Sequence, residues 1–355
     1  MRPGLWRLRA TVGGRRVSRT VQVDPRAPRR EVEAALRSLQ AEAPRSTRRT
    51  VPELLDRFVA HLEARGRTPR TVAEARRTAS RVLGPALPMR VSRLTTEDVD
   101  ALWTRLSREG AAPASVRRYH AVLSAALELA VDWEWIPANP AKRAHPPPLR
   151  RREIDLPSVV EVRSLIANVA ARGELGERLA ALLLILATTG MRRGEACGLR
   201  WSDVDLDAGT IRVRRSIWRV AGELGEGPPK SGRERTITPA PEVMAWLRGW
   251  RETTQPSNAR CWVVSRDPSG LRPINPDTLT SAVHRAARAL GIDVHVHTLR
   301  HWAATEMVGS GVSVADAAAV LGHASPRMIL EVYGHPVDER GATGPLAKAL
   351  PARRP

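Results

Sequence analysis

The chain has 355 residues, of which 42% are hydrophobic, so it is long enough for two or three domains with packed cores, and global disorder is excluded. Its formal net charge of +20 predicts a polyanionic partner. A membrane surface is the rival partner, but no basic amphipathic helix or lipidation motif supports it. The charge therefore favours nucleic acid.

The longest apolar run, residues 179–187, is far shorter than the ~20 residues of a membrane span, and the first residues lack the apolar core of a signal peptide. We therefore expect a soluble, cytoplasmic protein. Two cysteines, Cys197 and Cys261, are too few for a disulfide framework or a zinc cluster. Both are predicted to fill cores, Cys197 on a helix and Cys261 at the start of a strand.

The amino-terminal segment is predicted to be a small module with two strands and one helix. Residues 1–23 form a hairpin pattern around the turn signal Gly13-Gly14, and a helix begins near Pro28. Through residue 50 the segment holds 13 arginines against 4 acidic residues. A β-ribbon can enter a DNA groove, so residues 1–43 are interpreted as a DNA-reading module, with a solvated basic tail as the alternative.

Residues 50–140 show the periodicity of four helices. Leu54, Leu55 and Phe58 share one face of the first helix, and Thr95 or Thr96 is predicted to cap the third. A Pro-rich, charged segment at 141–154 is expected to be an interdomain linker.

The larger domain is predicted at 155–340, with a tail at 341–355. Several of its helices end at glycine, and strands are predicted around the loop GELGEGPPKSGR. The fold class is therefore mainly α with a small β-sheet. The tail is expected either to pack on a neighbouring protomer or to fray.

Three segments of this domain carry groups suited to a phosphate. In TTGMRRGEA, Gly190 favours a left-handed turn from which Arg192 and Arg193 enter a short helix. In HTLRHW, His297 and Arg300 are three residues apart at a helix start and can face one side. His295 and His297 also form an H-x-H pair, but no cluster of further ligands accompanies it, which disfavours a metal site.

The third segment is LGHASPRMILEVYGH, in which His323 follows a helix-ending glycine and Tyr333 comes ten residues later. The only other tyrosine, Tyr119, lies in the four-helix unit and is interpreted as structural. Lys230 is one of three lysines in a chain whose basic residues are otherwise arginine. A lysine in a Gly/Pro-rich loop suggests a transferable proton, because arginine is too basic to donate one.

Taken in order, these motifs resemble the tyrosine recombinase (phage integrase) family. The family pattern is an arginine after a TG turn, a lysine on a hairpin, H-x-x-R, L-G-H and a tyrosine about ten residues later. The chain supplies all of these at Arg192, Lys230, His297, Arg300, His323 and Tyr333. The resemblance covers 155–335 by motif and 50–140 by architecture, as a core-binding domain. Residues 1–42 match an arm-type DNA-binding domain more weakly.

The resemblance implies a site-specific DNA recombinase that needs no metal or other cofactor. Tyr333 would attack the scissile phosphodiester and form a 3′-phosphotyrosine, with Arg192 and Arg300 holding the phosphate oxygens. His297 is the candidate base, Lys230 the candidate acid for the 5′-hydroxyl, and His323 a hydrogen-bond donor. Glu195 is expected to orient its neighbours.

The resemblance also implies its partners: double-stranded DNA attachment sites, a homotetramer assembled on DNA, and accessory bending and directionality proteins. Three alternatives stay open, namely a type IB topoisomerase-like enzyme, a chromosome-dimer recombinase and a non-catalytic DNA-binding protein. The amino-terminal module favours a mobile-element integrase over the first two. The complete set of chemical positions disfavours the third.

Overall fold

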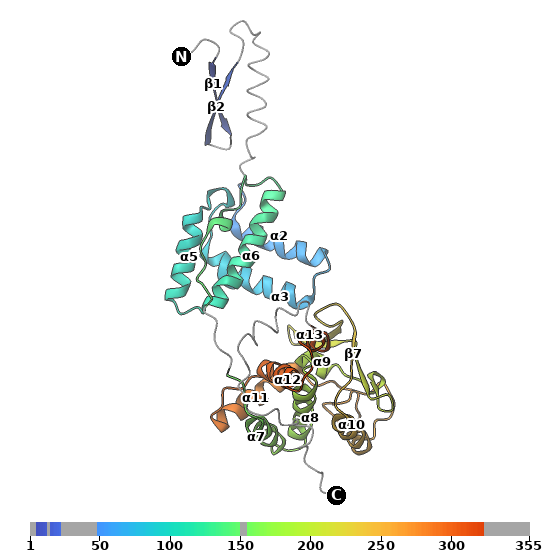
Figure 1. Ribbon diagram of the computed structural model, residues 1–355. Helices are drawn as coiled ribbons and strands as arrows, with labels where there is room; N and C mark the ends of the chain where they lie inside the picture. The colour runs from blue at the N-terminus through green and yellow to red at the C-terminus, as the bar shows by residue number, and fades with distance from the viewer. Residues whose placement is uncertain (1–4, 13–14, 23–47, 150–154, 323–355) are drawn as a thin grey trace. The chain divides into compact units, whose positions relative to one another are not determined.

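The computed structural model describes residues 5–12, 15–22, 48–149 and 155–322 (Figure 1). The chain divides into two compact units, residues 1–151 and 152–355. Within the described ranges, none of the helices is long and apolar enough to cross a membrane.

The predicted amino-terminal hairpin is present. Strands β1 (Leu5–Val12) and β2 (Arg15–Gln22) pair antiparallel, with Leu5 opposite Gln22 and Val12 opposite Arg15. This register places the Gly13-Gly14 turn signal between the strands. The helix expected from Pro28 lies outside the described residues.

Helices make up the rest of the first unit, and their starts follow local capping chemistry. Thr50 and Thr95 each accept a hydrogen bond from the backbone of the third residue of the helix, whose carboxylate bonds back to the cap nitrogen. Leu54, Leu55 and Trp103 are buried in the shared core. The helices are α2 (Val51–Ala64), α3 (Pro69–Thr78), α4 (Gly84–Ala86), α5 (Thr96–Arg108) and α6 (Pro113–Asp132), with a π-helical segment (Ala79–Leu83) between α3 and α4.

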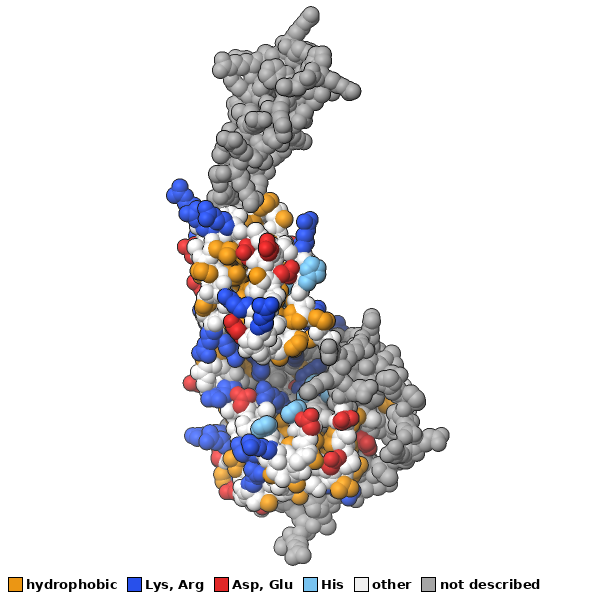
Figure 2. All heavy atoms as spheres, turned by 90° about the vertical axis from the view of Figure 1, so that its left-hand side faces the viewer, with side chains coloured by type: hydrophobic (Ala, Val, Ile, Leu, Met, Phe, Trp, Pro, Cys, Tyr) orange, Lys and Arg blue, Asp and Glu red, His pale blue; other side chains and the backbone are white. Residues whose placement is uncertain are grey.

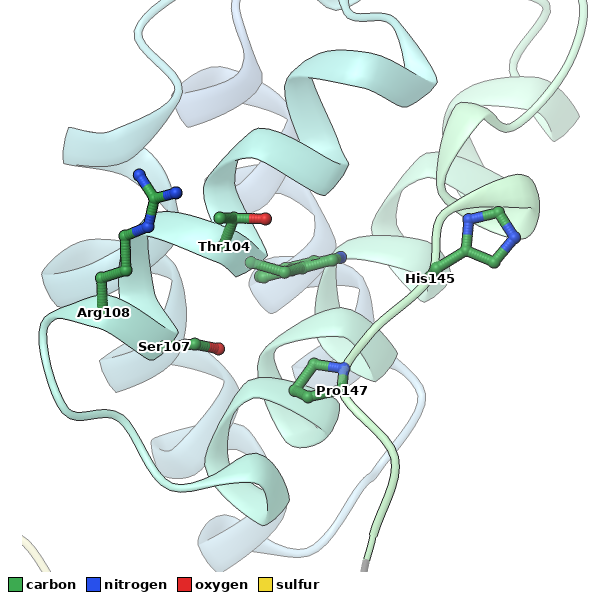
Figure 3. Close-up of a pocket in the computed structure, with 6 residues that line it drawn as sticks. Thr104, Ser107, Arg108, His145 and Pro147 are labelled. Carbon is green, nitrogen blue, oxygen red and sulfur yellow. The ribbon is translucent and has the colours of Figure 1, made fainter.

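The first part of the expected linker is bonded to this helical unit. The carbonyl of Pro140, at the start of a 3-10 turn (Pro140–Arg143), accepts from Thr96 Oγ1 (3.0 Å). After the turn, the backbone nitrogen of His145 donates to Asp100 Oδ1 (2.6 Å). Arg117 donates to the carbonyl of Pro147 (3.3 Å). A pocket of about 390 Å³ opens between α5 and this segment (Figure 3), lined by Trp103, Thr104, Ser107, Arg108, His145 and Pro147.

The second unit is built around α8 (Glu174–Thr189), whose residues from Leu179 to Ala187 are all buried. A helix that is apolar on every side must be surrounded, and the neighbours of α8 supply the cover. Cys197 and Cys261 both lie in this core, as expected. The other helices are α7 (Val159–Ala170), α9 (Arg193–Cys197), α10 (Pro241–Thr254), α11 (Pro276–Leu290), α12 (Val296–Gly309) and α13 (Val314–Leu321).

The β-structure is small and antiparallel, in agreement with the predicted class. A three-stranded sheet has the order β3 (Val204–Asp205), β4 (Thr210–Val213), β7 (Arg235–Ile237). A separate hairpin joins β5 (Ser216–Val220) to β6 (Glu223–Gly227). The sequence pattern predicted a loop at the β6 residues and gave no prediction for α10. It predicted a strand from Cys261, where the structure has only isolated bridges at Trp262 and Ser265.

Two glycines end helices beside the candidate site in the left-handed conformation predicted for Gly190. Gly190 (φ +64°) closes α8, and Gly322 (φ +68°) closes α13. A β-carbon on Gly190 would collide with Leu321 Cδ2, and one on Gly322 would lie 3.1 Å from Arg235 Nη1. The absent side chains therefore allow the ends of α8 and α13 to approach one another and the arginine side chains.

Candidate active site

A buried carboxylate joins two arginines at the start of α9. Glu195 is 1% exposed, and its two oxygens accept from Arg192 Nη1 (3.0 Å) and Arg235 Nη2 (2.6 Å). It also accepts from the backbone nitrogen of Arg192 (3.0 Å), which caps the helix. Burial alone would raise the pKa of Glu195, but the hydrogen bond and charge of Arg235, together with the hydrogen bonds of Arg192, hold that pKa below its ordinary value. Glu195 is therefore ionised and fixes both guanidiniums.

The carboxyl end of α13 accepts from three arginines in succession. Arg235 Nε donates to the carbonyl of Val320 (2.7 Å), Arg300 Nη2 to that of Leu321 (2.6 Å), and Arg192 Nη2 to that of Gly322 (3.1 Å). The last carbonyls of a helix lack helical partners and carry partial negative charge, so cationic donors are favoured there. We call Arg192, Arg235, Arg300 and Glu195 the arginine cluster.

Arg300 is the most deeply placed guanidinium of the cluster. Only 3% of the residue is exposed, and Nη1 donates to the carbonyl of Gly190 (2.7 Å), so the side chain links the ends of α8 and α13. Burial and the neighbouring charge of Arg192 lower the pKa of Arg300 to about 9, against the opposite effect of Glu195. The group is still cationic at neutral pH, and its charge is fixed in place before any substrate arrives.

The two adjacent arginines of the TGMRR motif point to different partners. Arg192 bonds to Glu195 and Gly322, within the cluster. Arg193 instead bonds to Thr280 Oγ1 and to the carbonyl of Pro276 on α11 (3.4 Å), and it pairs with Asp277 (3.3 Å). Arg193 thus ties α9 to α11, and Arg192 is the one directed at the candidate site.

Lys230 lies near enough to His297 for its charge to act on the imidazole. Partial burial of the His297 ring, followed by the charges of His301, Arg300, Arg192 and Lys230, lowers the pKa of His297 to about 4, although the residue as a whole is exposed. The His301 ring meets that of His297 edge to face, with centroids 4.7 Å apart. Lys230 itself is exposed in the turn between β6 and β7. The imidazole is therefore neutral at physiological pH and able to accept a proton.

The structure thus brings together Arg192, Glu195, Arg300, His297 and Lys230 of the predicted set. His323 and Tyr333 lie outside the described residues, and their placement stays a prediction. His323 directly follows Gly322, the residue at the end of α13 whose carbonyl accepts from Arg192.

Two neighbours of this site carried no assignment in the sequence analysis. Arg235 gives no distinctive signal in a chain with so many arginines, and its partner residues lie 40 and 85 positions away. His301 was visible in the HTLRHW segment, four residues after His297 on the same helix, a spacing that places both on one face.

The donor set is cationic and does not match a metal centre. His295 caps α12 and pairs with Asp293 (Nε2–Oδ1 3.4 Å). Among the residues that the structure describes, no three His, Cys, Asp or Glu side chains are grouped to hold a metal ion. A cradle of guanidinium and imidazole groups suits an oxyanion such as phosphate.

A family model described as the phage integrase family matches residues 159–340, more than half of the chain. The chain belongs to the phage integrase family. Among the family's curated members, the tyrosine recombinase XerC of Corynebacterium glutamicum is 27% identical over 306 residues, covering 81% of this chain and 88% of its own. The integrase of Mycobacterium phage D29 is 27% identical over 289 residues, covering 79% and 74%.

Solved structures of integrases share the fold of this phage integrase family member. The Tn1549 transposon integrase in complex with a circular intermediate DNA superposes with a TM-score of 0.68 at 17% identity, covering 81% of this chain and 95% of that one. A lambda integrase tetramer bound to a Holliday junction gives a TM-score of 0.63 at 18% identity and covers 96% of both chains. The mainly helical class with small antiparallel sheets is therefore confirmed.

Proposed function

We propose that this protein is a site-specific recombinase that cuts and rejoins DNA through Tyr333, integrating or excising a mobile element. The observation that carries the proposal is the arginine cluster, in which Arg192 and Arg300 are fixed at one helix end beside a neutral His297. On the face shown in Figure 2, Lys and Arg side chains lie on both units, as expected for binding to a phosphate backbone.

In the proposed reaction, the phenolic oxygen of Tyr333 forms a bond to the scissile phosphorus, and the bond from phosphorus to the 5′ oxygen breaks. The phenol proton passes to His297, and Lys230 gives a proton to the departing 5′ oxygen. A 5′-hydroxyl of the partner strand then attacks the phosphotyrosine, and the same steps run in reverse. The covalent intermediate retains the bond energy, so no nucleotide is consumed.

The arginine cluster suits the charge that this reaction develops. A phosphodiester has one negative charge, and its five-coordinate transition state has about two. Groups fixed in advance where charge develops lower the barrier without reorganisation at the moment of reaction. Arg192 and Arg300 bind the non-bridging oxygens, His323 donates a further hydrogen bond, and Glu195 orients the guanidiniums.

The role of His297 as base predicts a specific pH dependence. A pKa lowered to about 4 from the ordinary 6.5 leaves the imidazole unprotonated in the free protein down to that pH. With DNA at subsaturating concentration, the pH profile of covalent attachment reflects the pKa values of the free protein. The fall in rate on the acid side of this profile (its acid limb) is therefore expected well below pH 6.5. Bound phosphate adds negative charge beside the ring, so the limb at saturating DNA is expected at a higher pH.

The measurement is the pH profile of covalent attachment at both DNA concentrations. The variant His297→Gln is expected to lose the acid limb in both profiles, together with a factor of about 10²–10⁴ in rate. If the fall in rate at low pH occurs at the same pH in this variant as in the wild type, a group other than His297 causes it.

The experiment that tests the proposed function uses a suicide substrate. A duplex containing a candidate recombination site is nicked near the scissile bond, so that the short 5′-hydroxyl fragment diffuses away after cleavage. A live recombinase stays attached to the 3′ end and migrates as a protein–DNA adduct under denaturing conditions. A folded protein that binds this DNA but forms no adduct would contradict the proposed function and favour a non-catalytic DNA-binding protein.

Strand exchange distinguishes the two enzymatic alternatives from integration. A type IB topoisomerase-like enzyme rejoins the strand that it has cut. Formation of a Holliday junction from two duplexes would therefore contradict the topoisomerase-like alternative. Recombination between sites on separate molecules, taken from DNA flanking the coding region, supports integration. The hairpin formed by β1 and β2, which precedes the helical unit in the chain, favours a mobile-element integrase over a chromosome-dimer recombinase.

The proposed partners are DNA attachment sites, three further copies of this chain and accessory bending and directionality proteins. Exchange between two duplexes involves four strand cleavages, which four active sites supply. The lambda integrase structure mentioned above is a tetramer on a Holliday junction, a precedent for this assembly.

A further inference from the structure

Arg235 belongs to the arginine cluster, yet the proposed reaction gives it no role. Its side chain extends from β7 and is 10% exposed, with Nη2 on Glu195 Oε2 (2.6 Å) and Nε on the carbonyl of Val320 (2.7 Å). One guanidinium therefore joins the β-sheet to both the buried carboxylate and the end of α13. Such a bidentate connection depends on the planar fork of arginine.

The third nitrogen of this guanidinium lies against the backbone of Gly322. Nη1 is buried and has no hydrogen-bond partner among the described residues. A β-carbon on Gly322 would lie 3.1 Å from it, a tight contact that the glycine avoids. A buried donor without a partner has an energetic cost and calls for an explanation.

The charges of the cluster explain what Arg235 contributes. Among the described residues, Arg192, Arg235 and Arg300 supply three positive charges, and Glu195 is the carboxylate bonded to two of them. The balance of these four groups is +2. Without Arg235, Glu195 would be paired with Arg192 alone, and the balance would fall to +1.

We propose that Arg235 is a positioning residue for strand cleavage, and this inference rests on the proposed recombinase function. It neutralises the carboxylate of Glu195, so that the positive charges of Arg192 and Arg300 remain available to the scissile phosphate. It also fixes the end of α13, the point from which the chain continues to His323. Arg235 touches neither DNA nor Tyr333 in this role.

The decisive experiment is a charge-rescue cycle on the suicide substrate, with full-length protein at saturating concentration. Arg235→Met is expected to lower the first-order rate of adduct formation about 100-fold, within the range known for groups that act on transition-state charge. Adding Glu195→Gln removes the unpaired carboxylate and is expected to recover about tenfold of that loss. DNA affinity should change by less than about threefold, because Arg235 is buried.

A second arginine–carboxylate pair in the same unit provides the matched control. Arg215 is 14% exposed and pairs with the buried Asp203, and its other bonds, to Glu226 and the Gly198 carbonyl, involve no member of the arginine cluster. Arg215→Met removes a comparable buried ion pair and is expected to leave the rate within about twofold of wild type below its unfolding temperature, with no rescue by Asp203→Asn. Thermal unfolding of every variant establishes the temperature at which rates are compared.

Arg235→Lys distinguishes charge from shape, because its ammonium can neutralise Glu195 but cannot also hold Val320. It is expected to retain more activity than Arg235→Met. Wild-type rates in Arg235→Met, or a loss that Glu195→Gln does not relieve, would overturn the proposal. If Arg235→Met does not fold, Arg235→Gln takes its place under the same criteria. Absence of an adduct from the wild-type protein would instead contradict the recombinase function itself.

Discussion

Tyr333→Phe is expected to abolish the covalent protein–DNA adduct while leaving DNA affinity within about twofold of wild type. The substitution removes only the phenolic oxygen, which in the proposed reaction forms the bond to phosphorus. The basic surface that binds the DNA backbone is unchanged, so binding persists. The measurement is the fraction of suicide substrate that stays attached to protein under denaturing conditions, compared with a native gel-shift titration.

The chain provides a complete control for this experiment, because Tyr119 is its only other tyrosine. Tyr119 packs against the core of the helical unit, with the Arg118 guanidinium 5.6 Å from its ring centroid. Tyr119→Phe should therefore form adduct at the wild-type rate. An adduct that survives in Tyr333→Phe and disappears in Tyr119→Phe would reassign the nucleophile.

Arg192→Ala is expected to lower the rate of adduct formation by about 10²–10³, the effect of removing one fixed donor from a developing negative charge. Arg193→Ala is expected to lower it less than about tenfold, because Arg193 bonds to Thr280 and Asp277 on α11 and acts on the site only through the position of α9. Single-turnover rates on the suicide substrate measure both.

These two variants also control for each other in DNA binding. Each removes one positive charge from neighbouring positions, so each should reduce the salt dependence of binding by at most about one counterion. Any difference in rate between them then reflects the chemical step. Equal losses in the two variants would contradict the assignment of Arg192 and imply that the whole α9 turn acts as one unit.

Local chemistry made much of the fold readable from the sequence. Thr95 caps α5, with Glu97 and Asp98 in its first turn, as its position before an apolar-periodic segment indicated. Gly190 adopts the left-handed turn expected after α8. These features depend on residues within one helical turn of each other, so the sequence alone contains the information.

The features that escaped prediction depend on distant residues or lack a local pattern. The β6 residues, ELGEG, include two glycines and carry little strand propensity, and they are ordered by pairing with β5. The role of Arg235 follows from its contacts with Glu195 and Val320, which no local rule connects. The family motifs predicted Arg192, Lys230, His297 and Arg300 as site residues, and the structure describes all four, whereas His323 and Tyr333 lie outside the described residues.

The contacts that build the arginine cluster join segments far apart in the chain. The Arg192–Gly322 bond spans 130 residues, Arg300–Gly190 spans 110, and Arg235–Val320 spans 85. A nascent polypeptide that has been synthesised up to residue 300 contains both the TGMR and the HTLR motif. It does not yet contain α13, at whose end their arginine side chains assemble. Any fragment that ends before α13 therefore lacks the carbonyls on which the three arginine side chains assemble.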